Sequence, residues 1–491
     1  HKQGLMPKEV WGGVGGSQYR DAFEEFANGR VVMYYAGSWL LRRMESQVTK
    51  NFQLIGGLRH EAYENKNGDG QVFLKVKDQI HPRLAFTWDV DGDSSTKIFG
   101  SAGRYGVQIP THLAVRGASR STFTRQYFTY TGVDANGQPI GRVDLGDPYS
   151  SNNEYGQPKD YKTVAAQDLK PNSQDELTLG IEKALSDSLT VGGRVTYRKL
   201  VATIDDLCDY RPFTQYAIDH GITDANGNPF EVGVNPAPFG CASFNPGQSN
   251  TFLVDYKGDG NYTKVSLSKE QLGFDSAKRT YFAVDMFAEH PYKDGWYGKV
   301  SYTWSQSKGN TEGQTLSDVG QTDVAATQTW DFPAIMEGAY GYLPGDRRHQ
   351  IKAYGYLEVT PELQVGANVL LASGRARSCL GVYPNGNDDF ETYIKYGSYY
   401  HYCNGKLSPR GSEGFLPWDK ELDLNVIYKP SIVKGLALRA DIFNVFNTQV
   451  VQNVYERGET SGGAVNPAYT RPYSFTPERK VKFTVSYDHA F

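Results

Sequence analysis

The sequence lacks any apolar run long enough to cross a membrane as a helix, which takes about 20 residues. Mean hydropathy is -0.54, and hydrophobic residues make up 39% of the chain. These values alone favour a soluble protein. They leave a membrane β-barrel open, because barrel strands alternate apolar with polar residues and barrel loops are polar.

The chain also lacks a strong charge of either sign and any familiar catalytic motif. It has 51 basic and 55 acidic residues, and nothing in this balance suggests nucleic-acid binding. GxSxG, HExxH and P-loop patterns are absent. Its histidines are scattered. An outer-membrane hydrolase would need a Ser or Asp beside a His at the barrel wall, and this alternative stays open. We therefore expect no nucleic acid, no enzyme activity and no cofactor.

Cysteine is scarce: there are four, which fall as two local pairs in polar stretches. We expect two disulfides, one between Cys208 and Cys241 and one between Cys379 and Cys403, formed in an oxidising compartment. The alternative is four free thiols in a cytosolic protein. A metal site has little support, because no CxxC pattern occurs and only His401 lies near a cysteine. We expect the disulfides to staple loops that have no hydrophobic core of their own.

Tyrosine and glycine are plentiful, with 34 and 53 residues, and this composition favours β-structure. The last stretch, KVKFTVSYDHAF, alternates strictly to the final residue. One face carries the apolar and aromatic residues Val481, Phe483, Val485, Tyr487, His489 and Phe491. Such a strand suits either a soluble sheet with one buried face or the closing strand of a transmembrane β-barrel.

Twelve further segments read as strands. They are 29–41, 52–62, 83–89, 97–105, 176–182, 189–198, 281–289, 296–305, 349–359, 363–371, 420–428 and 436–446. Short turns and long loops alternate between them. Outer-membrane barrels have short periplasmic turns and long extracellular loops, whereas a solenoid or propeller needs a fixed repeat that is missing here. The pattern predicts an all-β fold, an antiparallel transmembrane β-barrel in the bacterial outer membrane.

The strand count predicts that the chain is part of a larger barrel. With about thirteen strands and short turns on the periplasmic side, the first and last strands both run inward. Residues 1–28 would then lie outside the cell, whereas a chain delivered from the periplasm should start on the periplasmic side. An odd count also conflicts with the even strand count of single-chain bacterial barrels. We expect residues 1–491 to be the carboxy-terminal part of one barrel domain, with about 13–14 of about 22 strands. A hidden strand in 71–77 or 123–130 would break this inference.

Several segments together resemble the barrel of TonB-dependent outer-membrane receptors, especially the Oar-like group. They are His81–Gly106, Gln167–Leu185, Leu343–Val359, Leu370–Cys379, Ala437–Val451 and the terminal strand. Ala376 stands where that family usually has Pro after the SGR triplet. The resemblance implies a receptor and transporter for a scarce ligand. The family's plug domain, TonB-contacting box and first strands are not in this chain.

The resemblance also implies partners. They are outer-membrane lipid, TonB through the absent plug, the barrel assembly machinery and a small ligand such as a carbohydrate, a peptide or a metal chelate. Phe483, Tyr487 and Phe491 are the expected assembly signal. Among the loop tyrosines, Tyr396, Tyr399 and Tyr402 could stack on a ligand, or could simply pack a loop. Arg347 and Arg348 could face an anion or anchor the membrane interface.

Two alternatives from other classes stay open. One is a structural or adhesive surface barrel without active uptake. The other is a soluble all-β binding protein. Dependence on detergent separates the soluble reading from the barrels, and uptake that requires the inner-membrane energy complex separates the transporter from the adhesive barrel.

Overall fold

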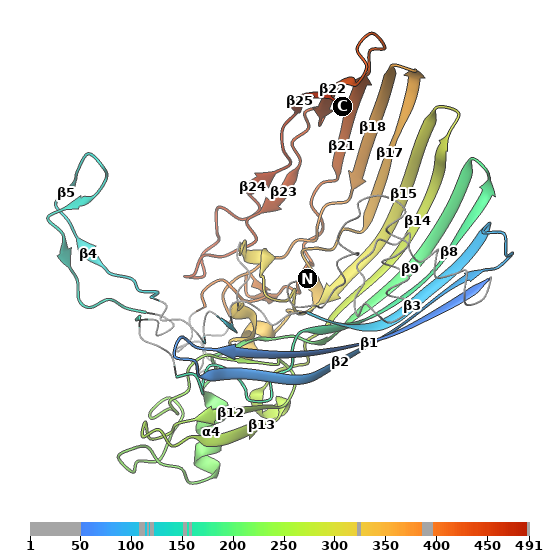
Figure 1. The fold of residues 1–491 in the computed structure, drawn as a ribbon. Helices are drawn as coiled ribbons and strands as arrows, with labels where there is room; N and C mark the ends of the chain where they lie inside the picture. The colour runs from blue at the N-terminus through green and yellow to red at the C-terminus, as the bar shows by residue number, and fades with distance from the viewer. Residues whose placement is uncertain are drawn as a thin grey trace.

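A computed structural model describes residues 51–107, 113–114, 117, 122–150, 155–156, 160–321, 326–384 and 396–488. Its main feature is one curved antiparallel sheet (Figure 1). The sheet runs in chain order through β1 (Phe52–Lys66), β2 (Val72–Asp89), β3 (Thr96–Gly106), β8 (Ser173–Ser186), β9 (Leu189–Ala202), β14 (Arg279–Lys293), β15 (Trp296–Gly309), β17 (His349–Thr360), β18 (Leu363–Ala372), β21 (Asp419–Tyr428), β22 (Leu436–Phe443) and β25 (Lys480–Tyr487). The short strand β16 (Gly341–Tyr342) pairs with the loop end of β15.

The predicted antiparallel, barrel-type sheet is confirmed, and so is the placement of its strands. Every predicted segment from 52 onward is one strand of the sheet, while segment 29–41 lies outside the described residues. Short connections gather at one end of the sheet, the turn end, at 90–95, 187–188, 294–295, 361–362 and 429–435. Long connections gather at the other, the loop end, at 107–172, 203–278, 310–348, 373–418 and 444–479.

One connection departs from the expected alternation. The sequence led us to expect a long loop between Ala62 and Arg83, but β1 and β2 continue toward each other and meet in the tight turn 67–71 at the loop end. Segment 71–77 is therefore mostly part of β2, not an extra strand. The extension is favourable because Phe73, Leu74 and Val76 are buried in a hydrophobic core beyond the sheet. Within segment 123–130, only Phe128–Thr129 forms a strand (β4), outside the main sheet.

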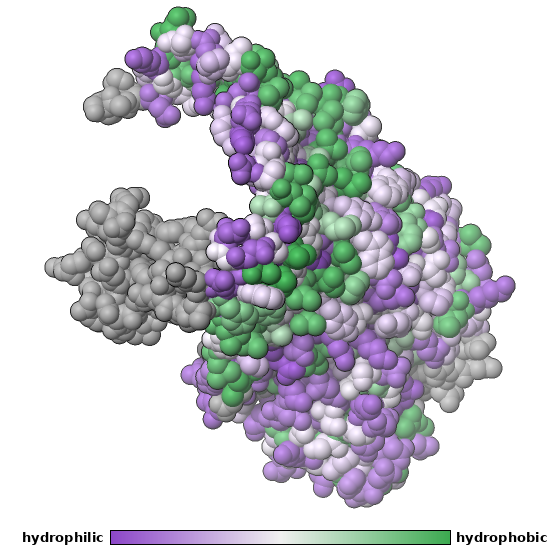
Figure 2. All heavy atoms as spheres, turned by 90° about the vertical axis from the view of Figure 1, so that its right-hand side faces the viewer, coloured by the Kyte–Doolittle hydropathy of each residue, from purple (hydrophilic) through white to green (hydrophobic). Residues whose placement is uncertain are grey.

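The two faces of the sheet differ sharply in polarity. Val300 pairs with Ala353 on one face, and its side chain is half exposed although nonpolar. On the other face Arg194 pairs with Asp285, and their side chains form an ion pair of 2.9 Å. Viewed from the side, apolar residues gather over the strands and hydrophilic residues over the loop end (Figure 2). A broad apolar outer face that no described segment covers is what a lipid-facing barrel wall requires.

Aromatic residues mark both borders of the apolar face. Trp304 and its neighbour Tyr302 lie toward the loop end of β15, and the His349 ring stacks between Tyr302 and Trp418. Toward the turn end, Trp296 begins β15 and stacks on His290. Such belts are typical of the two membrane–water interfaces.

The connections at the loop end fold into a packed layer, the loop layer. It contains α4 (Arg211–Asp219), α5 (Lys269–Leu272), η4 (Ser317–Val319), η5 (Gln328–Trp330), η6 (Pro333–Met336) and the paired strands β10 (Asp205–Leu207) with β11 (Ala242–Phe244), β12 (Asn250–Val254) with β13 (Thr263–Leu267), β19 (Tyr402–Cys403) with β20 (Lys406–Leu407) and β23 (Val451–Val454) with β24 (Pro472–Phe475). None of the helices in the described part of the chain has the length and hydropathy that a bilayer span demands.

The expectation that the loops have no hydrophobic core of their own is wrong. The largest buried cluster lies in the loop layer, around Phe213, Phe244, Phe252 and Trp330, which are almost fully inaccessible to solvent. Aromatic rings give it shape: Phe213 stacks on Phe239 with centroids 3.6 Å apart. The layer is therefore a folded body held by apolar burial, and not a set of separate polar loops.

Both predicted disulfides are confirmed. Cys208 follows β10 and bonds to Cys241, which precedes β11, so this bridge closes one end of that strand pair. Cys379 bonds to Cys403, the last residue of β19. A Cβ atom on Gly458 would lie 2.4 Å from the Cys379 sulfur, so glycine is needed where the 444–479 connection passes this bridge.

A hairpin arm projects from the loop layer (Figure 1). It consists of β4 paired with β7 (Val143–Asp144) and β5 (Gly132–Val133) paired with β6 (Pro139–Ile140). Much of its apolar surface is exposed, including Tyr127, Val133 and Leu145.

Candidate functional site in the loop layer

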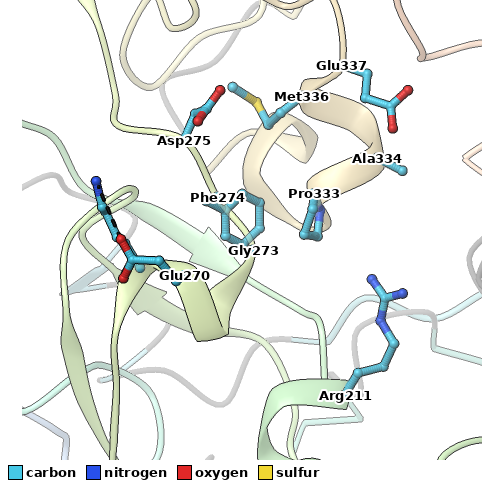
Figure 3. A pocket seen from close by; sticks show the side chains of 10 residues that line it. Arg211, Glu270, Gly273, Phe274, Asp275, Pro333, Ala334, Met336 and Glu337 are labelled. Carbon is cyan, nitrogen blue, oxygen red and sulfur yellow. Dashed lines mark ion pairs between the residues drawn. The ribbon is translucent and has the colours of Figure 1, made fainter.

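An open pocket of about 620 Å³ lies in the loop layer, between the 203–278 and 310–348 connections (Figure 3). Its lining residues are Arg211, Lys269, Glu270, Gly273, Phe274, Asp275, Pro333, Ala334, Met336 and Glu337. Two loops that are distant in sequence thus build one cavity within the range typical of small-ligand sites.

Local sequence signals fix the wall formed by α5. Ser268 caps this helix: its hydroxyl accepts from the Gln271 amide at 3.3 Å, and the Gln271 side chain accepts from the Ser268 amide at 2.9 Å. Gly273 ends it with φ 77°, a conformation that favours glycine. A Cβ there would lie 3.1 Å from Pro333 Cγ, so the end of α5 packs closely against η6.

The charges of the pocket are largely paired within the chain. Arg211 forms a 2.8 Å ion pair with buried Asp209, and Lys269 lies 3.6 Å from Glu270. Asp275 and Glu337 add two further carboxylates to the lining. Because both cations already have acidic partners, the cavity favours neutral or cationic polar ligands over anions.

Two of the three predicted ligand-binding tyrosines, Tyr396 and Tyr402, contact residues in or next to the pocket wall but do not line the pocket themselves. The Tyr402 hydroxyl donates to Glu337 at 2.6 Å, and the Tyr383 hydroxyl donates to the same carboxylate at 3.0 Å. The Tyr396 hydroxyl donates to Asp331 at 2.5 Å, and its ring packs near Phe332. Burial and the neighbouring carboxylates raise the pKa values of both Tyr396 and Tyr402.

The third tyrosine, Tyr399, contacts a different part of the loop layer. Its ring lies 4.1 Å from the guanidinium carbon of Arg457, whose Nη2 also donates to the Tyr399 hydroxyl. Another loop tyrosine of this segment, Tyr393, and the adjacent acidic pair Asp388 and Asp389 lie outside the described residues. A direct role of these tyrosines in ligand contact stays a prediction, and the structure places Tyr396 and Tyr402 where they support η6 and Glu337.

Sequence reasoning missed the residues that line the pocket. Arg211, Phe274 and Met336 come from segments without a motif, and only the capping box before α5 marks an ordered element there. Their proximity depends on how two long loops pack, which no local pattern encodes.

The inner face of the sheet offers a second polar surface below the loop layer. Arg198, Asp285 and Lys352 are among the residues lining a cavity of about 520 Å³ on the wall. Lys299 pairs with Glu289 at 2.8 Å along the same face. A charged inner wall suits a lumen filled by water or by a polar plug.

Buried ion pairs join three of the long connections. Arg410 from 373–418 pairs with Asp318 from 310–348 at 3.1 Å, and both side chains are about 1% exposed. Arg375 pairs with Glu456 from 444–479 at 2.5 Å. Ser378 links the two pairs, because its amide donates to Glu456 at 2.6 Å and its hydroxyl donates to Asp318 at 3.3 Å.

Neighbouring titratable groups respond to this buried charge. Burial and the nearby Arg410 guanidinium lower the pKa of His401, so its imidazole is neutral. Burial and the Asp318 carboxylate raise the pKa of Glu312. The same two causes raise the pKa of Glu456 to about 7, against an opposing effect of Arg375.

The raised pKa of Glu456 predicts a pH-dependent loop layer. Its folded pKa of about 7 lies above its ordinary 4.5, so folding favours the proton. The resulting stability is complete below about pH 4.5 and is lost as pH rises through 7, by up to about 3 kcal/mol. Hydrogen exchange of the Ser378 amide, corrected for intrinsic rate, should be faster at pH 8 than at pH 5.5.

Glu456→Gln should flatten this pH dependence between pH 5 and 8. Glu413→Gln, at an exposed loop position, should leave it as in the unmodified protein. An unchanged profile in Glu456→Gln would assign the dependence to another group, such as Glu312.

The comparisons with known proteins agree with the barrel reading. No known family profile matches the chain. The chain is 25% identical over 489 aligned residues to the TonB-dependent transporter Oar of Myxococcus xanthus, a match that covers 88% of this chain. It spans about 40% of the length of that relative. The resemblance to Oar-like transporters, predicted from sequence segments, is confirmed, and an outer-membrane location agrees with it.

Solved structures align with much of the chain at low identity. They include the outer membrane transporter YddB from Escherichia coli, with 13% identity, a TM-score of 0.44 and coverage of 89% of this chain and 50% of that one. The siderophore receptor PiuA from Acinetobacter baumannii aligns with 11% identity, a TM-score of 0.42 and coverage of 90% and 41%. A likeness of this degree does not identify a ligand.

Proposed function

We propose that this chain is the carboxy-terminal part of the barrel of an outer-membrane transporter that takes up a scarce ligand with energy supplied through TonB. The observation that carries the proposal is the combination of a lipid-type outer face with a folded, pocket-bearing loop layer at one end of the same sheet. The similarity to Oar, a TonB-dependent transporter, supports the same function and gives no support to an enzyme.

In this proposal each face of the molecule has a separate task. The loop layer faces outward and captures the ligand in the pocket beside Glu337, where Tyr402 holds the carboxylate. The polar inner wall bounds the lumen, in which a plug from another part of the protein would contact TonB. The terminal strand, including Phe483 and Tyr487, would be recognised by the barrel assembly machinery, while Phe491 lies outside the described residues.

The pocket chemistry narrows the ligand to polar molecules without a strong negative charge. Its carboxylates offer acceptors, and Phe274 with Met336 offers apolar contact. A peptide or an oligosaccharide fits these properties better than an anionic metal chelate does.

A depletion experiment tests the function while the ligand is still unidentified. Cells with the full-length protein receive a defined mixture of peptides and oligosaccharides, and loss of each compound from the medium is followed by mass spectrometry. At least one compound should be depleted by these cells but neither by cells lacking the protein nor by cells lacking TonB. Depletion that persists without TonB, or no selective depletion, would favour a surface barrel without active uptake.

Filling the pocket should slow this uptake. Glu270 lines the pocket and is exposed, so Glu270→Trp places a bulky ring in it with little effect on the core. We expect uptake at least about tenfold slower, as when a central contact of a binding site is lost. Glu413→Trp makes the same change outside the pocket lining and should take up the compound normally. Equal uptake by both variants would place the ligand elsewhere in the loop layer.

A further inference from the structure

A continuous row of polar residues crosses the outer face of the sheet near its loop end. The strand register places Arg104, Asp175, Lys199, Thr280, Lys308 and Tyr342 side by side on β3, β8, β9, β14, β15 and β16. Residues paired directly across neighbouring strands share a face. All six side chains therefore lie on the outer face.

The row lies at the border of the apolar face. The next outward-facing register row toward the turn end runs through Ala102, Leu177, Tyr197, Phe282 and Gln306, and the one after it through Gly100, Leu179, Val195, Val284 and Trp304. Leu177 and Leu179 are each 56% exposed, because no described part of the protein covers them. The polarity changes within one row, as at the level where hydrocarbon meets headgroups.

The charge of the row is predominantly positive. Three cations face one carboxylate, and Arg104 already uses that carboxylate in a two-point contact with Asp175 of 2.7 and 2.9 Å. Neither Lys199 nor Lys308 forms an ion pair with a described residue. Lys199 on β9 and Lys308 on β15 lie on either side of Thr280 on β14. Their strands are two apart in the sheet, so their backbones are separated by roughly 10 Å. Flexible lysine side chains can converge on one group over that span.

One further cation, Arg348, continues the row. Lys308 Nζ lies 4.4 Å from the centroid of the Tyr342 ring, and the guanidinium carbon of Arg348 lies 4.7 Å from it. Unlike the two lysines, Arg348 already forms an ion pair, with Asp346 at 2.8 Å. Arg348 also lies over Trp304, 6.0 Å from the ring centroid, which places it at the same border. Arg347 has a different role, since it donates to Gln452 at 2.7 Å and to the Ser373 carbonyl at 3.1 Å.

We propose that Lys199 and Lys308, with Arg348 beside them, bind the phosphate of a lipid headgroup in the outer leaflet of the surrounding membrane. Three observations support this occupant. The site faces away from the lumen, it lies at the level where headgroups would lie, and its two lysines form no ion pair within the described part of the chain. A phosphate is an acceptor-only anion that both ammonium and guanidinium groups bind.

This site is independent of the transported ligand. The lipid site requires the membrane-spanning fold but not uptake. An experiment can therefore disprove the lipid site while the proposed transport function holds, or disprove transport while the lipid site holds. Its consequence would be mechanical: a bound lipid would tie β9, β14 and β15 together at their loop ends. The 203–278 connection of the pocket begins and ends there, and the 310–348 connection begins there.

Lipid retention by the full-length protein tests the proposal. The protein is placed in nanodiscs of zwitterionic phospholipid that contain a small fraction of either phosphorylated or dephosphorylated lipid A, and bound lipid is counted by native mass spectrometry. We expect the unmodified protein to retain phosphorylated lipid A preferentially. The double variant Lys199→Gln, Lys308→Gln should lose about fivefold in this preference for each lysine removed.

Matched variants separate the site from general charge. Lys429→Gln with Lys434→Gln removes two exposed lysines at the turn end and should retain the preference, because the turn 429–435 lies at the opposite membrane interface. Lys199→Arg with Lys308→Arg should retain it as well. The heat-dependent mobility of the folded barrel on gels, together with the two single Lys→Gln variants, guards against a folding defect.

Several results would overturn the proposal. They are equal retention of both lipid A forms by the unmodified protein, an undiminished preference in the Lys→Gln double variant, and an equal loss in the turn-end control. Addition of inorganic phosphate distinguishes the source: displacement of the lipid by millimolar phosphate would identify a site for the free ion and overturn the assignment to lipid.

Discussion

Val300→Arg should destabilise the barrel by about 2–4 kcal/mol, the cost of an arginine at the midplane of a barrel's lipid face. Val300 lies halfway between Trp296 and Trp304 on the same face of β15. These two tryptophans are eight residues apart, or about 26 Å along the strand. With a strand tilt of about 40° this corresponds to about 20 Å of height, most of an apolar belt that is about 25 Å tall. A guanidinium at Val300 therefore has the longest path to either headgroup layer.

The neighbouring position provides the control. Ser301 points to the polar inner face, where it pairs with Lys352 and lines the same cavity as Thr303. Ser301→Arg should therefore cost less than about 1 kcal/mol apart from any effect on lumen contents. Urea unfolding of each variant in lipid vesicles measures both. If Ser301→Arg proves the more damaging change, the two faces of the sheet have been assigned the wrong way round.

The sheet could be predicted because its physical signal is local. Lipid on one side and water or polar protein on the other impose period-two alternation on every strand, as in Leu189–Ala202 and Trp296–Gly309. The turns at the turn end are short, so strand order follows chain order. Each strand could thus be recognised separately. Most strands extend beyond their predicted bounds, whereas β22 ends at Phe443, short of the predicted residue 446.

The β1–β2 hairpin shows why those ends were missed. Alternation breaks down at Phe73 and Leu74, which are adjacent in sequence and both buried. A strand that leaves the membrane and enters a protein core is apolar on both sides, so the rule that marks membrane strands no longer applies. The sequence suggested a loop at the point where the environment of the strand changes.

The loop layer could not be predicted for a related reason. Its core combines Phe213 and Trp330 from two separate connections with Phe73 from strand β2, and the candidate pocket needs the packing of those two connections. Local cysteine pairing did reveal both disulfides, because each bridge closes within a single connection. Contacts between connections, such as the hydrogen bond from Tyr402 to Glu337, have no such sequence mark.

Arg410→Met should destabilise the loop layer by about 3–5 kcal/mol, the usual cost of removing one partner of a buried ion pair. The Asp318 carboxylate would remain buried among Glu312 and Glu456 without its cation. The backbone of Arg410 would keep its hydrogen bond to Tyr342, whose amide donates to the Arg410 carbonyl at 3.1 Å. Without the side-chain ion pair it would still be less firmly held. The lost contact joins 310–348 to 373–418, so both connections should become accessible to protease while the sheet stays intact.

Two further variants show whether the lost energy is electrostatic. Arg142 forms an ion pair with Asp144 in the exposed arm, and Arg142→Met should cost at most about 1 kcal/mol. Asp318→Leu combined with Arg410→Met removes both charges and should recover much of the loss, because the uncompensated carboxylate is gone. Limited proteolysis and thermal unfolding of the loop layer compare the three proteins. A double variant as unstable as Arg410→Met alone would show that the guanidinium acts mainly through its packing, so that the three long connections are joined by shape rather than by charge.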